Sequence, residues 1–94
     1  MRPRLSPTLT LFTKQYCGLC ESAKETILRV QQKVPFVLTE VDIEQPANKE
    51  WLRKYMFDVP VLHAGDKLVG MHRFTEREVE AWVQSDEISQ GNKT

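Results

Sequence analysis

Two cysteines separated by two residues are the clearest chemical feature of the sequence. Cys17 and Cys20 stand at the start of a predicted helix, one turn apart, and Lys14 precedes them. Unpaired amides and the helix dipole favour a thiolate at such a position, and the lysine adds positive charge, so the pKa of the first thiol is expected to fall. Because the thiolate is the attacking form, we predict that Cys17 attacks a disulfide and Cys20 resolves the product.

The cysteine pair has two other interpretations. A single buried cysteine often serves only as a small apolar residue, which would suit Cys20 on the inward stripe of the helix. A zinc site needs four ligands, and the only histidines, His63 and His72, have eight residues between them, where zinc motifs use about three to five. The spacing therefore favours thiol chemistry and predicts no metal ligands. His63 is expected to face outward from its strand.

Val59-Pro60 and the segment from Gly70 to Arg73 are further candidate site residues. A proline next to a strand removes an amide donor, and one reason for it is a cis peptide bond that brings the backbone to a ligand. Gly70 either allows a close backbone approach or ends a strand. His72 and Arg73 either pair with a carboxylate or face water. The residues alone leave these alternatives open.

The hydrophobic pattern predicts the elements that would hold these residues. Apolar and β-branched runs predict strands at Thr8–Thr13 and Phe36–Ile43, a short strand reached through Asp58–Leu62, and a strand at Lys67–Met71. Helices are predicted at Cys17–Val34, after Pro46 on the stripe of Ala47, Trp51 and Tyr55, and after the capping box Thr75–Glu78, with Val79, Trp82 and Val83 inward.

This β-α-β-α-β-β-α order predicts an α/β fold with a mixed four-stranded sheet and three helices. The strand–helix–strand start requires a crossover and a parallel pair, and the turn at Ala64–Lys67 predicts an antiparallel hairpin. Phe36–Ile43 is apolar on both faces, so it is expected to be covered on both sides.

Length and charge restrict the possible functions. The chain has 94 residues, enough for one small domain, with 13 basic and 13 acidic side chains. A zero net charge argues against nucleic acid or an anionic membrane as the main partner. No apolar run approaches the roughly 20 residues of a membrane span. Two cysteines are too few for a secreted disulfide framework and suit a reducing compartment.

The ends of the chain are expected to be flexible tails around one domain. The predicted domain covers residues 8–84, the N-terminal tail residues 1–7 and the polar C-terminal tail residues 85–94. The first residues, MRPRLSP, are rich in arginine and lack acidic residues, which also fits the remnant of a mitochondrial presequence. The expected location is therefore cytoplasmic or mitochondrial.

The sequence resembles the glutaredoxins. The matching segments are LTLFTK, YCGLC, the DVP step at Asp58–Pro60, and GDKLVG, in this order over about residues 8 to 84. The resemblance is closest to a small glutaredoxin-like branch with a C-x-L-C motif, a V-D-I segment and an F-D-[IV]-P-V step. Gly18 and Leu19 replace the usual proline and aromatic residue between the cysteines, and Asp58 replaces the usual threonine.

The resemblance implies a thioredoxin fold in which a cis-proline, Pro60, faces the active cysteine. It implies that Cys17 is the nucleophile and Cys20 the resolving thiol, and that glutathione is a co-substrate rather than a bound cofactor. The glutathione or substrate site would comprise Lys14, Tyr16, Val59, Pro60, Gly70, His72 and Arg73. Lys14 would lie near the glycine carboxylate of glutathione, and the backbone of Val59 would pair with its cysteine.

The implied function is reduction of disulfides or glutathione mixed disulfides in proteins by a monomeric thiol–disulfide oxidoreductase. Two alternatives accompany it. Glutaredoxins with glycine after the nucleophilic cysteine can hold an iron–sulfur cluster between two subunits, and Gly18 matches that feature. An inactive relative could instead use the groove to bind glutathione or a partner peptide.

Overall fold

The computed structural model describes residues 7–91, and it describes side chains as far as Gln84. A four-stranded sheet in the order β2-β1-β3-β4 forms its centre. The strands are β1 (Thr8–Thr13), β2 (Val37–Asp42), β3 (Val61–Ala64) and β4 (Lys67–Met71), and the helices are α1 (Gly18–Gln31), α2 (Lys49–Tyr55), which follows a 3-10 turn at Pro46–Asn48, and α3 (Glu76–Gly91). The predicted element order and mixed sheet are confirmed.

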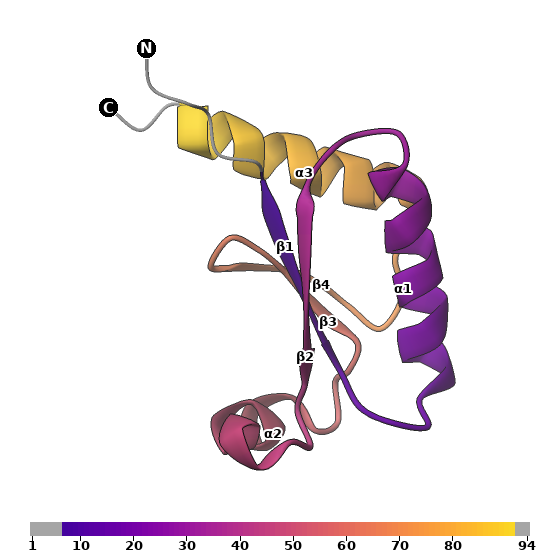
Figure 1. Ribbon diagram of the computed structural model, residues 1–94, viewed down its shortest axis with the longest axis vertical. Coiled ribbons are helices and arrows are strands. Elements are labelled where there is room, and N and C mark those ends of the chain that lie inside the picture. The colour runs from indigo at the N-terminus through magenta and orange to yellow at the C-terminus, as the bar shows by residue number, and fades with distance from the viewer. Residues whose placement is uncertain (1–6, 92–94) are drawn as a thin grey trace.

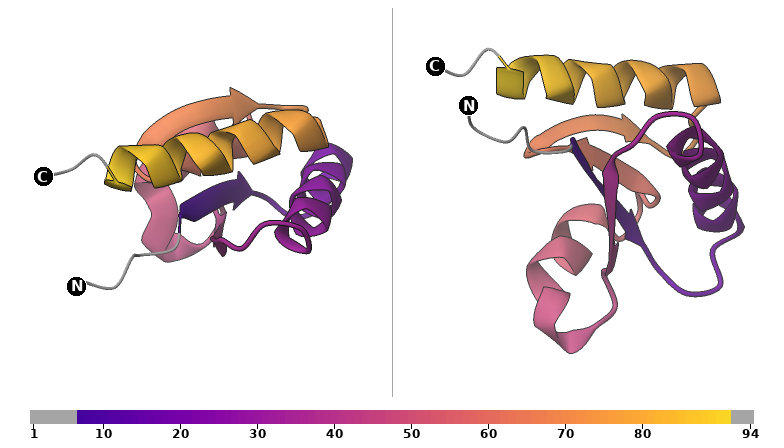
Figure 2. Two further views of the ribbon diagram at one scale, coloured as in Figure 1. Left: turned by 90° about the horizontal axis from the view of Figure 1, so that it is seen from above. Right: turned by 45° about the horizontal axis from the view of Figure 1, so that its top comes forward.

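The helices cover the two faces of the sheet in three layers (Figure 1). The side chains of α1 and α3 pack with Leu9 and Leu11 in one buried cluster. Phe12, the next residue of β1, points to the opposite face and joins Tyr55 of α2 in a second cluster. Because successive residues of a strand alternate between faces, β1 supplies both clusters. Figure 2 shows α3 running across the sheet on the side of α1.

Strand pairing explains how the central strands are buried. β1 pairs in parallel with β2 and antiparallel with β3, and β3 pairs antiparallel with β4. All four residues of β3 are buried. β2 lies at an edge of the sheet, and Val37 is 48% exposed. The prediction that β2 is covered on both faces is therefore wrong, although its parallel pairing is confirmed.

The start of α3 follows the predicted capping box. The Thr75 hydroxyl accepts a hydrogen bond from the Glu78 amide at 3.1 Å, and the Glu78 carboxylate accepts one from the Thr75 amide at 3.0 Å. Two otherwise unpaired amides are thereby satisfied. Arg29 in the last turn of α1 and Lys33 just after the helix also form ion pairs with Glu76, at 2.8 and 3.1 Å. These contacts hold the start of α3 against the end of α1.

The predicted tails are only partly described. Residues 1–6 and 92–94 lie outside the described residues, whereas residues 85–91 continue α3 as helical backbone. The proposed boundary of the domain at residue 84 stays a prediction. Within the described range, no helix is both long enough and apolar enough to cross a membrane.

Candidate active site

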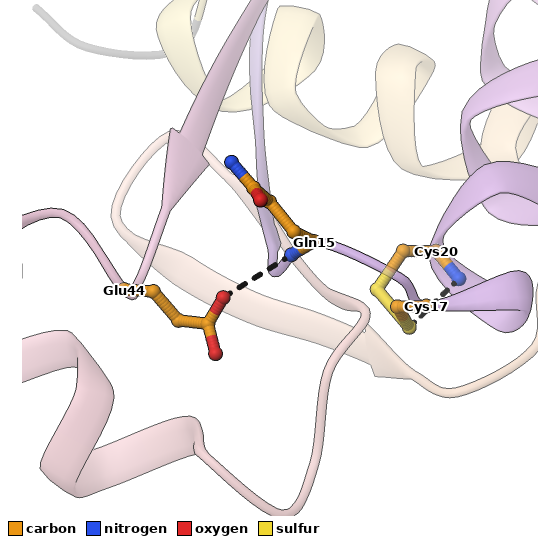
Figure 3. The surroundings of a disulfide bond; sticks show 4 residues. All are labelled: Gln15, Cys17, Cys20 and Glu44. Carbon is orange, nitrogen blue, oxygen red and sulfur yellow. Dashed lines mark hydrogen bonds between the residues drawn. A yellow bond between two sulfur atoms is a disulfide. The ribbon is translucent and has the colours of Figure 1, made fainter.

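The cysteine pair lies where β1 turns into α1. Cys17 is the N-cap of α1, with extended backbone angles of φ −119° and ψ 104°, and its Sγ accepts a hydrogen bond from the Cys20 amide at 3.2 Å. A sulfur atom thus occupies the place of the usual capping oxygen. A disulfide joins the two cysteines, whose Cα atoms are 5.2 Å apart (Figure 3). The predicted proximity is confirmed.

The two sulfur atoms differ in exposure. Cys20 is 4% exposed and packs in the cluster with Phe12, Ile43 and Val61, whereas Cys17 is only partly buried at its rim. An attacking thiolate must reach its substrate, but a resolving thiol needs only to reach the first sulfur. The difference in burial suits the predicted division of roles.

The segment Asp58–Pro60 faces this cluster from the start of β3. The Val59–Pro60 peptide bond is cis, as the resemblance predicts, and Val59 is 7% exposed within the cluster that contains both cysteines. The Pro60 carbonyl accepts a hydrogen bond from the His72 amide at 2.7 Å. In the part of the chain that the structure describes, neither the N–H nor the C=O of Val59 has a hydrogen-bond partner.

Strand register places four chain segments at the same end of the sheet, where the strands begin or stop. Phe12 pairs with Val61, Val61 with Met71, and Thr13 with Asp42. The segments after β1, β2 and β4 and the segment before β3 therefore leave the sheet at the same end. These segments carry the predicted site residues Lys14, Tyr16, Cys17, Val59, Pro60, His72 and Arg73.

Two polar contacts at this end of the sheet were not predicted. The Glu44 carboxylate accepts a hydrogen bond from the Gln15 amide at 3.3 Å, and Figure 3 shows Gln15 between Glu44 and the cysteine pair. His72 Nε2 lies 3.7 Å from Asp58 Oδ1, with both side chains about half exposed. The parallel pairing of β1 and β2 could have predicted that Glu44 lies near Gln15, because parallel strands stop at the same end of a sheet.

The other predicted binding residues differ in their surroundings. Tyr16 is fully exposed and has a φ of 58°, and His72 has a φ of 72°; this left-handed region is uncommon for residues other than glycine. Lys14 is half-buried and Arg73 is exposed, and the Arg73 amide donates to the Met71 carbonyl at 2.8 Å. Their contacts with a substrate stay predictions.

Gly70 has a packing reason to be glycine. A Cβ atom there would lie 2.7 Å from the Trp82 ring and 3.0 Å from the Phe74 ring, which themselves pack edge to face at 5.6 Å. The aromatic pair leaves no room beside the Gly70 backbone. This contact explains the glycine without a ligand, and a role of Gly70 in substrate binding stays a prediction.

Gly70→Ala is expected to lower the free energy of unfolding by about 1–3 kcal/mol, the usual cost of overpacking. Gly18→Ala is the matched control, because nothing lies within 4 Å of a Cβ at Gly18. Urea unfolding of both variants measures the difference. Equal stability of the two variants would show that the aromatic pair does not restrict residue 70.

His63 is buried, so the expectation that it faces outward is wrong. It is 8% exposed, and its Nε2 lies 2.8 Å from the Tyr55 hydroxyl. Its ring also packs edge to face on Phe12 at 4.7 Å, beneath α2. The cause is the central place of β3, which is covered on both faces. Burial lowers the pKa of His63, as does nearby Lys54, while Asp66 opposes the shift.

The lowered pKa predicts a loss of stability at mildly acidic pH. The unfolded chain binds a proton at His63 below the ordinary histidine pKa of about 6.5, whereas the folded chain resists it. The free energy of unfolding is therefore expected to fall as pH decreases from 7.5 to 5.5. His63→Gln should flatten this slope. Urea titrations at several pH values give the slopes, and equal slopes for the wild type and His63→Gln would contradict the assignment.

Comparisons with known proteins show the family of the chain. Residues 8–84 match the family model described as Glutaredoxin-like domain (DUF836). A curated glutaredoxin-like protein of Dictyostelium discoideum is 37% identical over 75 residues, which cover 76% of this chain and 69% of that protein.

Solved structures give the fold its name. The solution NMR structure of a protein from Nitrosomonas europaea matches with a TM-score of 0.70 and 26% identity, covering 87% of this chain and 98% of that one. Thioredoxin O1 from Arabidopsis thaliana, crystallised in its oxidized state, matches with a TM-score of 0.60 and 24% identity, covering 85% of this chain and 77% of that one. The predicted thioredoxin fold is confirmed.

Proposed function

Because the chain belongs to the glutaredoxin-like family, we propose that it is a thiol–disulfide oxidoreductase whose nucleophile is Cys17. The observation that carries the proposal is the unequal cysteine pair. Cys17 is partly exposed at the start of α1, and its sulfur accepts a hydrogen bond from the Cys20 amide. The Cys20 side chain is buried one turn further along the helix.

The proposed reaction begins with the reduced pair. The Cys17 thiolate attacks one sulfur of a substrate disulfide, the substrate S–S bond breaks, and the released thiolate takes a proton from solvent. Cys20, as a thiolate, then attacks the Cys17 sulfur of the mixed disulfide and expels the second substrate thiol. The substrate gains two electrons, and the protein is left with the Cys17–Cys20 disulfide that the structure contains.

Glutathione is the proposed reductant. Two glutathione thiols supply two electrons, restore the dithiol and leave as glutathione disulfide. The half-buried Lys14 offers a positive charge to a carboxylate of glutathione. The N–H and C=O of Val59 lack partners among the described residues, so they are free to pair with the backbone of glutathione or of an extended peptide.

The unpaired backbone of Val59 could bind protein substrates as well as glutathione mixed disulfides. Backbone pairing at Val59 recognises any extended segment and is indifferent to its side chains. We therefore include disulfides and glutathionylated cysteines of proteins among the substrates. A compartment kept reducing by glutathione, cytoplasmic or mitochondrial, would supply the electrons.

The test is turnover of a glutathionylated peptide. The reduced protein is mixed with the peptide, glutathione, glutathione reductase and NADPH, and NADPH consumption is followed by absorbance. The proposal expects a rate that is proportional to protein concentration and well above the rate without protein. A rate equal to that of glutathione alone would contradict the proposed activity.

A further inference from the structure

Two large aromatic side chains are exposed in loops at the end of the sheet that carries the cysteine pair. Tyr16 is 100% exposed and Phe57 is 89% exposed, whereas Phe12, Phe36, Tyr55 and Phe74 are all buried. Burying a phenylalanine normally stabilises a fold, and Phe57 gives up this contribution. No ring contact of Tyr16 or Phe57 is found within the described range of the chain.

Strand register brings the loops of the two exposed aromatic residues to the same end of the sheet as Cys17. Phe12 of β1 pairs with Val61 of β3; Tyr16 lies four residues after Phe12, and Phe57 lies four residues before Val61. The loops that carry them, between β1 and α1 and between α2 and β3, lie at the same end of the sheet (Figures 1 and 2). Tyr16 immediately precedes Cys17, and Phe57 precedes the Asp58–Pro60 step.

We expect a protein substrate bound to Cys17 to lie near these side chains. In a mixed disulfide, the Cα atom of the substrate cysteine lies about 4.4–6.8 Å from that of Cys17. Its neighbours in an extended segment follow at about 3.3 Å per residue. We therefore expect a segment that also pairs with the Val59 backbone to pass over the loop of Phe57, with its other flank near Tyr16.

We propose that Phe57 and Tyr16 select protein substrates in which large apolar side chains flank the reactive cysteine. Exposed aromatic residues of this kind are the usual anchors of protein interfaces. Glutathione has no apolar side chain on either side of its cysteine, so it lacks the flanking groups that these two residues would select. The inference rests on the proposed oxidoreductase function and specifies its substrate class.

The experiment compares two glutathionylated peptides of equal length and charge, one with leucine and phenylalanine beside the cysteine and one with glycine and serine. The kcat/KM ratio of the two peptides measures selectivity for the wild type and for Phe57→Ser. Leu68→Ser is the matched control, because Leu68 is 44% exposed on β4, near the opposite end of the sheet.

The wild type is expected to prefer the apolar peptide by about tenfold, a range typical of one apolar contact. Phe57→Ser should lose most of this preference, chiefly through a higher KM, and Leu68→Ser should keep it. Equal ratios for the wild type and Phe57→Ser, with unchanged melting temperatures, would overturn the inference. Absence of turnover of either peptide by the wild type would instead contradict the proposed function.

Sedimentation velocity at the assay concentration supplies the second readout. We expect the wild type and Phe57→Ser to sediment alike as monomers. A wild-type dimer that Phe57→Ser converts to a monomer would show that a second copy of the chain covers the aromatic pair, and this would overturn the substrate assignment.

Discussion

Replacing Cys17 by serine is expected to lower turnover of a glutathionylated peptide by at least about a thousandfold, because it removes the proposed nucleophile itself. A serine hydroxyl is not ionised near neutral pH and does not form a disulfide. Serine is close to cysteine in size, so the cap of α1 and the surrounding cluster should remain. The coupled NADPH assay measures the rate, and the melting temperature checks that the variant is folded.

Cys20→Ser is the matched variant, with the same substitution at the buried sulfur. It is expected to slow turnover by only about tenfold or less, since glutathione can resolve the mixed disulfide in place of Cys20. It should abolish reduction of a protein disulfide that requires the second thiol. Equal loss from both substitutions would reject the glutathione-resolved route, and persistent turnover by Cys17→Ser would contradict the assigned nucleophile.

Phe12→Ala is expected to destabilise the fold by about 3–5 kcal/mol, a large share of the roughly 5–15 kcal/mol that stabilise a small domain. Phe12 is 2% exposed, and its ring lies 4.5 Å from Trp51, 5.2 Å from Tyr55 and 4.7 Å from His63, measured between centroids. Its removal opens a cavity in the cluster that also contains both cysteines.

Phe57→Ala makes the same chemical change at a side chain that is 89% exposed. Its stability should stay within about 0.5 kcal/mol of the wild type, as for most surface substitutions. Urea unfolding measures both variants. A cost for Phe57→Ala comparable to that for Phe12→Ala would mean that Phe57 packs on the fold, which contradicts its proposed role as a substrate contact.

Local sequence patterns predict several elements because their signals are local. The apolar and β-branched run Thr8–Thr13 forms β1 with the predicted bounds. Thr75 and Glu78 cap α3 as predicted, because a capping box involves only residues three apart. Cys17 and Cys20 are also close in the chain, so the first turn of a helix suffices to bring their sulfur atoms together.

The errors concern features that depend on the whole sheet. Apolar residues on both faces of Phe36–Ile43 suggested a covered strand, but β2 lies at an edge, where only β1 flanks it. A single histidine in a strand favours the solvent side, but β3 is covered on both faces, and Tyr55 satisfies the His63 ring. Strand order decides both cases, and strand order is not a local property.

The candidate site follows the same division. The cysteines and the Val59-Pro60 step were predicted from the residues and the resemblance, whereas the Asp58–His72 and Gln15–Glu44 contacts join segments far apart in the sequence. The exposure of Phe57 is opposite to the usual tendency of aromatic residues to be buried, so composition gave no warning of it. Only the register of β1 and β3 places its loop at the same end of the sheet as the cysteine pair.

The reactivity of Cys17 as a function of pH tests the central claim most directly. Cys20→Ser contains a single cysteine, so any mixed disulfide formed with a glutathionylated peptide must involve Cys17, and mass spectrometry gives its rate of formation. The account predicts a rate whose midpoint lies well below the value for a free thiol, about pH 8.5, and a fast reaction at neutral pH. A midpoint near that of free cysteine, with a rate no faster than that of an unfolded cysteine peptide, would contradict it.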